Sequence, residues 1–128
     1  MRDLLWIGAL AAALLACEPV KSEDACTPLD TPSFSNVYDI VLVSSCAVGG
    51  SCHGGGGSAG GLDLGDELTA YDALVEGGRV TPGDAASSLL MARLESDVSH
   101  SQHMPPGQLL SAPERCMIAT WINEGALP

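Results

Sequence analysis

Residues 45–57 read SCAVGGSCHGGGG, and this stretch decides how the whole chain is interpreted. Cys46 and Cys52 lie six positions apart, His53 follows the second cysteine, and four glycines follow the histidine. A segment so rich in glycine has no core of its own and is expected to be a loop. Two thiols and an imidazole on such a loop suit three kinds of chemistry: a disulfide, a metal site, or covalent attachment of haem.

Haem c chemistry needs two thioether bonds from cysteines and an axial bond from the histidine beside the second cysteine. The order of Cys46, Cys52 and His53 fits this requirement. The usual spacing places two residues between the cysteines, whereas five residues separate them here. The insert is small and flexible, so it could bulge while both sulfurs reach the vinyl groups.

A second axial ligand would complete such a site, and residues 103–107, HMPPG, offer Met104. The two prolines that follow fix the local backbone and stiffen the loop around the thioether. A methionine–histidine pair raises the reduction potential of a haem, which suits electron transfer. His100 and His103 are alternative sixth ligands and would give a lower potential.

The metal interpretation would combine Cys46, Cys52 and His53 with His100 or His103 and would suit zinc or copper. An oxidising compartment works against free thiolates, so this interpretation is the weakest of the three. No serine–histidine–aspartate spacing is apparent, and we expect no enzyme.

The N-terminus indicates export. An apolar run from Leu4 to Ala16 is too short for a stable transmembrane helix and is typical of a signal peptide. It ends in LLAC at Cys17, which resembles the lipobox of bacterial lipoproteins. This resemblance implies a signal peptide at 1–16, a lipid on Cys17 and a lipidated tether at 17–32, with the outer membrane preferred because Glu18 follows the cysteine.

The composition limits the remaining possibilities. A chain of 128 residues allows one compact domain, and a net charge of −11 disfavours binding to nucleic acid while permitting a basic protein partner. The chain has two Trp, two Tyr and one Phe, and Trp6 lies in the leader. So few aromatic side chains make a thin core, which favours a disulfide or a bulky apolar cofactor in the interior.

Apolar periodicity predicts four short helices separated by long loops rich in glycine and proline. Residues 33–45 form the first, although the β-branched run VYDIVLV leaves a strand as an alternative. A second helix covers 67–76, with Leu68, Tyr71, Leu74 and Val75 as its apolar positions. A third starts near Asp84, with a buried face formed by Ala86, Leu89, Leu90 and Leu94.

The last helix is the clearest. Ser111 and Glu114 form a capping box, with Pro113 in the first turn. The apolar stripe that follows consists of Met117, Ile118, Trp121 and Ile122, and Gly125 ends the helix.

The order of these segments resembles a known family. CHGGGGSAGGLDL is followed by VTPGDAASSLL, MPPGQLLSAPE and IATWINEGA, which together look like the small planctomycete-type cytochrome c domains. The likeness covers residues 33–126 and implies an all-α, cytochrome c-like bundle of about four short helices. By this resemblance His53 is the proximal ligand, Met104 the distal ligand, and Cys46 and Cys52 the attachment thiols of haem c.

Cys26 and Cys116 remain, one at each end of this domain. If the first and last helices pack together, a disulfide between them is possible and would fix the tether. The alternative is that Cys116 is a buried free thiol.

The sequence therefore leads to an expected function and one alternative. The first is a lipid-anchored, mono-haem electron-transfer or haem-binding protein of the cell envelope, facing the periplasm or the cell surface and docking with a redox partner. The alternative is a haem-free structural or interaction lipoprotein of the same fold, with Cys46 and Cys52 joined as a disulfide.

Overall fold

The structure is a computed structural model that describes residues 26–128. The predicted signal peptide, the predicted lipidation site Cys17 and the first part of the predicted tether lie outside these described residues. The chain forms the helical segments α1 (Phe34–Asn36), η1 (Val37–Cys46), η2 (Ala59–Gly61), α2 (Glu67–Leu74), α3 (Leu89–Glu95) and α4 (Ala112–Asn123). No strand occurs between residues 26 and 128, so the predicted all-α fold is confirmed.

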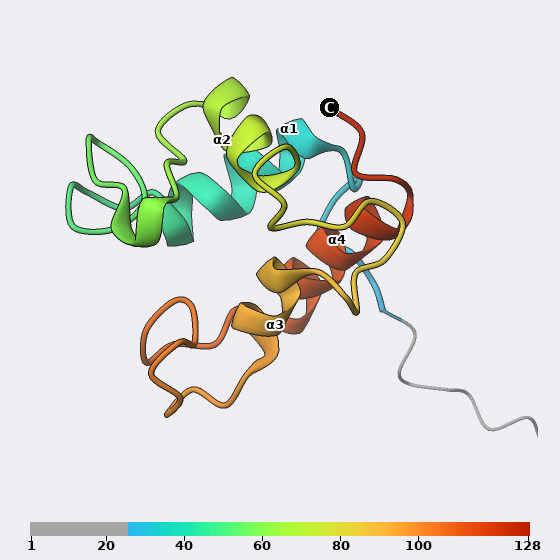
Figure 1. Cartoon of the computed structure of the whole chain (residues 1–128). Coiled ribbons are helices and arrows are strands. Elements are labelled where there is room, and N and C mark those ends of the chain that lie inside the picture. Colours follow the sequence, from blue (N-terminus) through green and yellow to red (C-terminus); the bar gives the residue numbers. More distant parts are fainter. Residues whose placement is uncertain (1–25) are drawn as a thin grey trace, which may run out of the picture.

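The first helix is continuous through α1 and η1, as Figure 1 shows. The Ser33 hydroxyl caps it by accepting a hydrogen bond from the backbone N–H of Asn36 at 3.2 Å. From Val37 onward the helix is π-helical, and its last turn ends with the N–H of Ala47 donating to the carbonyl of Leu42, five residues back. The helix prediction for this segment is confirmed and the strand alternative is wrong, but the wider hydrogen-bonding pattern was not predicted.

Helix α2 lies where the sequence placed it and ends two residues earlier than expected. Asp66 caps it by accepting from the backbone N–H of Thr69 at 3.0 Å. Leu74 and Ala70 are buried, whereas Leu68, one of the four apolar positions of the predicted helix, is 72% exposed. Leu68 lies in the first turn of the helix, where its side chain faces solvent.

Helix α3 starts later than expected, at Leu89, because a turn occupies the preceding residues. The Asp84 carboxylate accepts hydrogen bonds from both the backbone N–H and the hydroxyl of Ser87, which closes that turn. Met91 and Leu94 are the buried residues of α3.

The predicted buried face of this helix is therefore wrong in part. Ala86 and Leu89 are exposed and Leu90 is half-buried, whereas Leu94 is buried as expected. Ala85, which was not assigned to this face, is buried.

Helix α4 agrees with its prediction in full. Ser111 accepts from the N–H of Glu114, and the Glu114 carboxylate accepts in return from the N–H of Ser111. The four predicted stripe residues, Met117, Ile118, Trp121 and Ile122, are all buried. Gly125 follows with a φ of 110°, a conformation that favours glycine.

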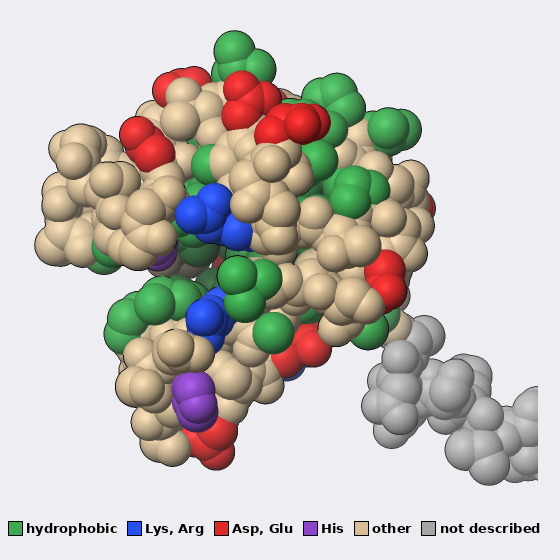
Figure 2. Space-filling view, in the orientation of Figure 1, with side chains coloured by type: hydrophobic (Ala, Val, Ile, Leu, Met, Phe, Trp, Pro, Cys, Tyr) green, Lys and Arg blue, Asp and Glu red, His purple; other side chains and the backbone are tan. Residues whose placement is uncertain are grey.

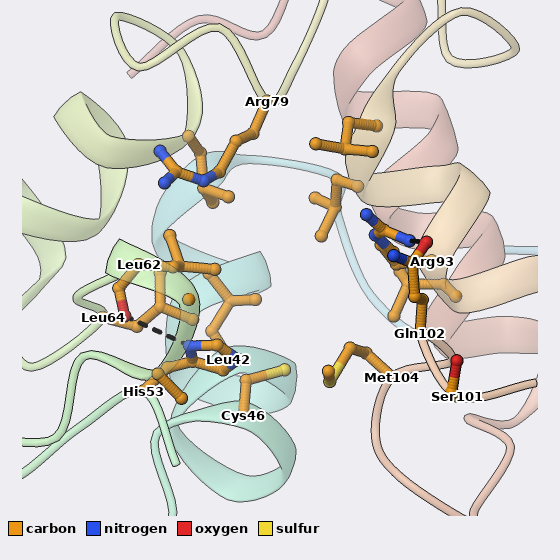
Figure 3. A pocket seen from close by; sticks show the side chains of 16 residues that line it. Leu42, Cys46, His53, Leu62, Leu64, Arg79, Arg93, Ser101, Gln102 and Met104 are labelled. Atoms are coloured by element: carbon orange, nitrogen blue, oxygen red, sulfur yellow. Dashed lines mark hydrogen bonds between the residues drawn. The ribbon is translucent and has the colours of Figure 1, made fainter.

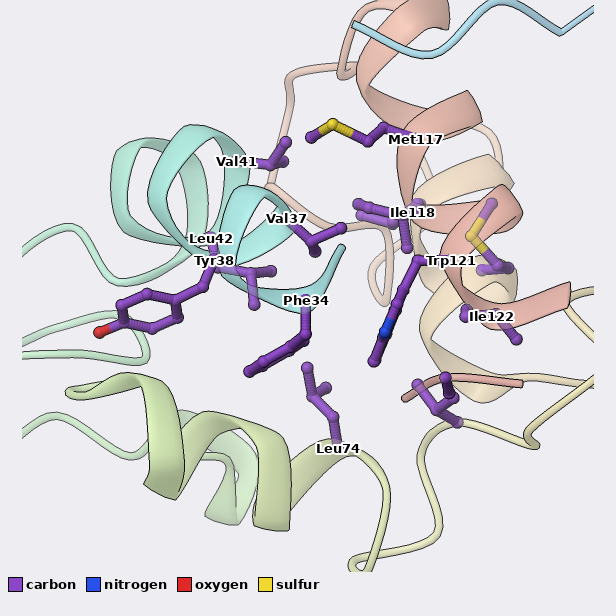
Figure 4. Packing of buried hydrophobic residues seen from close by; sticks show 14 of the residues in the cluster. Phe34, Val37, Tyr38, Val41, Leu42, Leu74, Met117, Ile118, Trp121 and Ile122 are labelled. Carbon is purple, nitrogen blue, oxygen red and sulfur yellow. The ribbon is translucent and has the colours of Figure 1, made fainter. Parts of the chain in front are cut away.

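The core is centred on the contact between the first and last helices (Figure 4). The ring of Phe34 lies 5.0 Å from that of Trp121 and 5.1 Å from that of Tyr71, measured between centroids. Helix α4 also contacts α3. One helix therefore joins the two halves of the molecule, one of which contains η1 and the other α3. The few aromatic side chains are thus concentrated where the terminal helices meet.

A disulfide between Cys26 and Cys116 fastens the N-terminal segment to α4, in agreement with the expected pairing. The two Cα atoms are 5.4 Å apart, and the bond links positions 90 residues apart in sequence. Among residues 26–128, no helix is long and apolar enough to cross a membrane.

We expect the double variant Cys26→Ser/Cys116→Ser to lose about 4 kcal/mol of unfolding free energy, because cross-linking so long a loop restricts the unfolded chain. Urea denaturation followed by circular dichroism measures this difference. Cys52→Ser, which removes a free thiol, is the control and should change stability by less than about 1 kcal/mol. Equal stability of the double variant and the parent would contradict this role of the disulfide.

Candidate functional site

A cavity of about 310 Å³ opens between the two halves of the molecule. Figure 2 shows it as a hollow in the surface, and Figure 3 shows the side chains that line it. One wall comes from η1 and the glycine-rich loop and carries His53, and the other comes from α3 and the loop after it and carries Met104. The lining is largely aliphatic and includes Leu42, Leu62, Leu64, Leu74, Leu89, Leu90 and Leu94.

His53 is held in place by three hydrogen bonds. Its backbone N–H donates to the Cys46 carbonyl at 3.2 Å, and its own carbonyl accepts from the N–H of Leu64 at 2.6 Å. Its ring Nδ1 lies 3.1 Å from the carbonyl oxygen of Leu62. Because a carbonyl can only accept, Nδ1 carries the proton and Nε2 keeps its lone pair. A carbonyl partner of this kind orients an imidazole and prepares its other nitrogen to bind a metal.

The glycines after His53 are required by close packing of the backbone. A Cβ atom on Gly54 would lie 2.5 Å from the carbonyl oxygen of Ala47, and one on Gly57 would lie 2.3 Å from that of Gly50. The backbone of the loop therefore folds back on itself beside His53 and leaves no room for a side chain at Gly54 or Gly57. The glycine-rich stretch is therefore a compact structure that presents the histidine to the cavity.

Met104 is positioned by the loop that follows α3. Its backbone N–H donates to the Arg93 carbonyl at 3.0 Å, which ties the loop to the end of that helix. The neighbouring His103 is buried, and its Nδ1 and Nε2 lie 3.1 Å from the Ser96 hydroxyl and 2.9 Å from the Gln108 carbonyl. His103 is therefore a structural residue that fixes the loop on either side of Met104.

The two histidines weighed as alternative ligands do not line the cavity. His103 has both ring nitrogens engaged in hydrogen bonds, and His100 is exposed, with its Nδ1 accepting from the N–H of Gln102. Met104 lines the cavity on the wall opposite His53 (Figure 3).

The two cysteines before His53 differ in position. Cys46 lines the cavity beside His53, and its sulfur points towards Met104 in Figure 3. Cys52 does not line the cavity, and its sulfur lies 4.0 Å from the Ser51 hydroxyl. Both are free thiols, so the structure does not contain the disulfide between them that the haem-free alternative requires.

Burial raises the pKa of the Cys46 thiol to about 11, and the neighbouring Cys52 and Glu114 add smaller effects in the same direction. Cys46 is therefore protonated at neutral pH and is a poor thiolate ligand. No group of three or more His, Cys, Asp or Glu residues that could hold a metal ion occurs in the described part of the chain. The proposed zinc or copper cluster with His100 or His103 is not assembled.

Sequence reasoning missed two charged residues of the cavity, Arg79 and Arg93. They lie far apart in sequence, and no motif links them. The one available signal was their rarity, because Arg115 is the only other Lys or Arg among residues 26–128.

Comparison with known proteins identifies the domain. Residues 50–108 match the family model described as planctomycete cytochrome C, which supports a planctomycete-type cytochrome c domain in this part of the chain. The match includes Cys52, His53 and Met104 and begins after Cys46. No curated protein and no solved structure matches the chain significantly.

We expect Gly57→Ala to destabilise the fold by about 1–3 kcal/mol, because the added methyl group would overlap the backbone of Gly50. Gly50→Ala is the matched control, since a Cβ there meets only the Gly55 carbonyl oxygen, at 3.6 Å. Urea denaturation measures both variants. Equal stability of the two would contradict the close packing described for this loop.

We also expect Cys46 in the haem-free protein to resist alkylation. A pKa of about 11 in place of the ordinary 9.0 leaves about 100-fold less thiolate at pH 8, so iodoacetamide should react correspondingly slowly and speed up as the pH rises towards 11. Peptide mass spectrometry after timed labelling gives the rate at this position. Labelling at pH 8 as fast as in the urea-unfolded chain would show that Cys46 is not enclosed.

Proposed function

We propose that this protein carries one haem c group in the cavity and transfers electrons through it, with His53 and Met104 as the axial ligands. The observation that carries the proposal is the orientation of His53. Its Nδ1–H bond to Leu62 leaves Nε2 free, and its side chain lies across an apolar cavity from the Met104 thioether. Imidazole and thioether are the axial pair of electron-transferring cytochromes c.

The remaining residues of the cavity fit the same group. Seven leucines supply apolar surface for a flat macrocycle. His53 and Met104 belong to separate walls, and the helices of these walls, η1 and α3, both contact α4. Cys46 and Cys52 are the thiols that we propose for covalent attachment. Cys46 lies beside His53 in the cavity, and Cys52 directly precedes the histidine in sequence.

When bound, haem supplies reversible one-electron chemistry at its iron. The side chains of the cavity set the conditions for that change. The Met104 thioether would favour the reduced state of a bound haem and raise its potential, and the leucines would surround the ring with apolar side chains. The Leu62 carbonyl keeps the imidazole ring of His53 oriented and increases its basicity. The match of residues 50–108 to a cytochrome c family supports a carrier over a catalyst.

The proposal extends to the location of the protein. The LLAC sequence ending at Cys17 supports a lipid anchor, with residues 17–32 as a tether to the cell envelope, and Glu18 favours the outer membrane. A net charge of −11 favours a redox partner with a basic docking surface and disfavours nucleic acid.

Variants of the two ligands test the proposal in protein exported by a host with cytochrome c maturation. We expect His53→Ala to abolish the low-spin haem absorption spectrum. Met104→Ala should retain haem but open the iron to carbon monoxide and lower the reduction potential, because the sixth position loses its thioether. Absorption spectroscopy and redox titration measure these changes.

His100→Ala is the control and should leave both the spectrum and the potential unchanged, because His100 is exposed and outside the cavity. A Met104→Ala protein with the parent spectrum and potential would refute Met104 as a ligand. A colourless parent protein would refute haem binding and support the haem-free structural lipoprotein.

A further inference from the structure

The distribution of positive charge in the molecule is uneven. The chain has a net charge of −11, and only Arg79, Arg93 and Arg115 are basic among residues 26–128. Two of these three, Arg79 and Arg93, line the cavity. Figure 2 shows basic side chains on both sides of the hollow, and Figure 3 shows Arg79 and Arg93 on opposite sides of the gap.

Neither arginine is neutralised by an acidic partner. The Arg79 guanidinium donates from Nη1 to the Ala73 carbonyl at 2.9 Å and from Nη2 to the Gly61 carbonyl at 3.1 Å. Arg93 donates from Nη1 to the side-chain carbonyl of Gln102. These acceptors are all uncharged, and no carboxylate within residues 26–128 forms an ion pair with either side chain.

Both guanidinium groups keep donors for a ligand. A guanidinium has five N–H groups, and the hydrogen bonds above use only two on Arg79 and one on Arg93. The neutral partners hold each group in place without cancelling its charge. Both side chains are half-buried, so an anion at the cavity would meet charges that water screens only in part.

We infer that Arg79 and Arg93 bind the two carboxylates of the tetrapyrrole, so that the cavity selects a dicarboxylate ring and orients its acidic edge. This inference rests on the proposed haem function and adds residues to it. An acidic protein repels a dianionic ligand through its general field, and the two arginines provide the local attraction that reverses this effect. The leucines of the cavity hold the apolar part of the ring.

The experiment compares haem with haem dimethyl ester, which has the same ring and iron but no free carboxylates. The full chain bearing Cys46→Ser and Cys52→Ser is used, so that binding stays reversible. Absorption titration gives the two dissociation constants. We expect this parent to bind haem at least about tenfold more tightly than the ester, because charge-assisted hydrogen bonds to two arginines are lost with the ester.

Arginine variants of the Cys46→Ser/Cys52→Ser protein show which residues cause the preference for haem over the ester. Arg79→Gln/Arg93→Gln should bring the ratio of the two dissociation constants close to one, and each single variant should give an intermediate ratio. Arg115→Gln is the matched control and should keep the parent ratio, because Arg115 does not line the cavity. Circular dichroism of each haem-free variant confirms that the fold is retained.

The outcomes separate this inference from the function on which it rests. Tight binding of both ligands with equal affinity by the parent would refute the arginine assignment and leave haem binding intact. A parent preference for haem that persists in the double arginine variant would also refute it. Binding of neither ligand by the folded parent would refute the haem proposal itself.

Discussion

The packing of the last helix against the first is the constraint on which the rest of the structure depends. Phe34 meets Trp121 at 5.0 Å, and the Cys26–Cys116 bond fastens the same junction from outside. Helix α4 also contacts α3, so this junction fixes the distance between the two halves. The η1 half presents His53, and the α3 half presents Met104. Because the helices of both walls contact α4, the packing around this one helix positions the two walls of the cavity.

Local signals in the sequence predicted the parts of the fold that are determined locally. The capping box of Ser111 and Glu114 and the apolar stripe of α4 lie within one helix, and both are present as expected. The prediction for α3 was less accurate, because the Asp84 carboxylate closes a turn with Ser87 and delays the start of the helix. Leu89 was assigned to the core from its periodicity. It is instead exposed and forms part of the apolar lining of the cavity.

His53 and Met104 stand out in the sequence by type and by motif, and the structure places both in the lining of one cavity. The arginines could not be predicted, because the fold brings Arg79 and Arg93 together from separate segments that share no pattern. The choice among histidines also needed the structure. His103 directly precedes Met104 in sequence, yet both of its ring nitrogens are engaged by Ser96 and Gln108. Sequence proximity alone does not show which of two adjacent side chains faces a cavity.

The central claim is that the cavity between His53 and Met104 holds covalently attached haem. Intact mass spectrometry, under denaturing conditions, of the full chain exported by a host able to mature cytochromes c tests this claim most directly. We expect a chain heavier by the mass of one haem, because thioether bonds survive denaturation. A chain with the unmodified mass, or one lacking two hydrogens as a Cys46–Cys52 disulfide would, contradicts it.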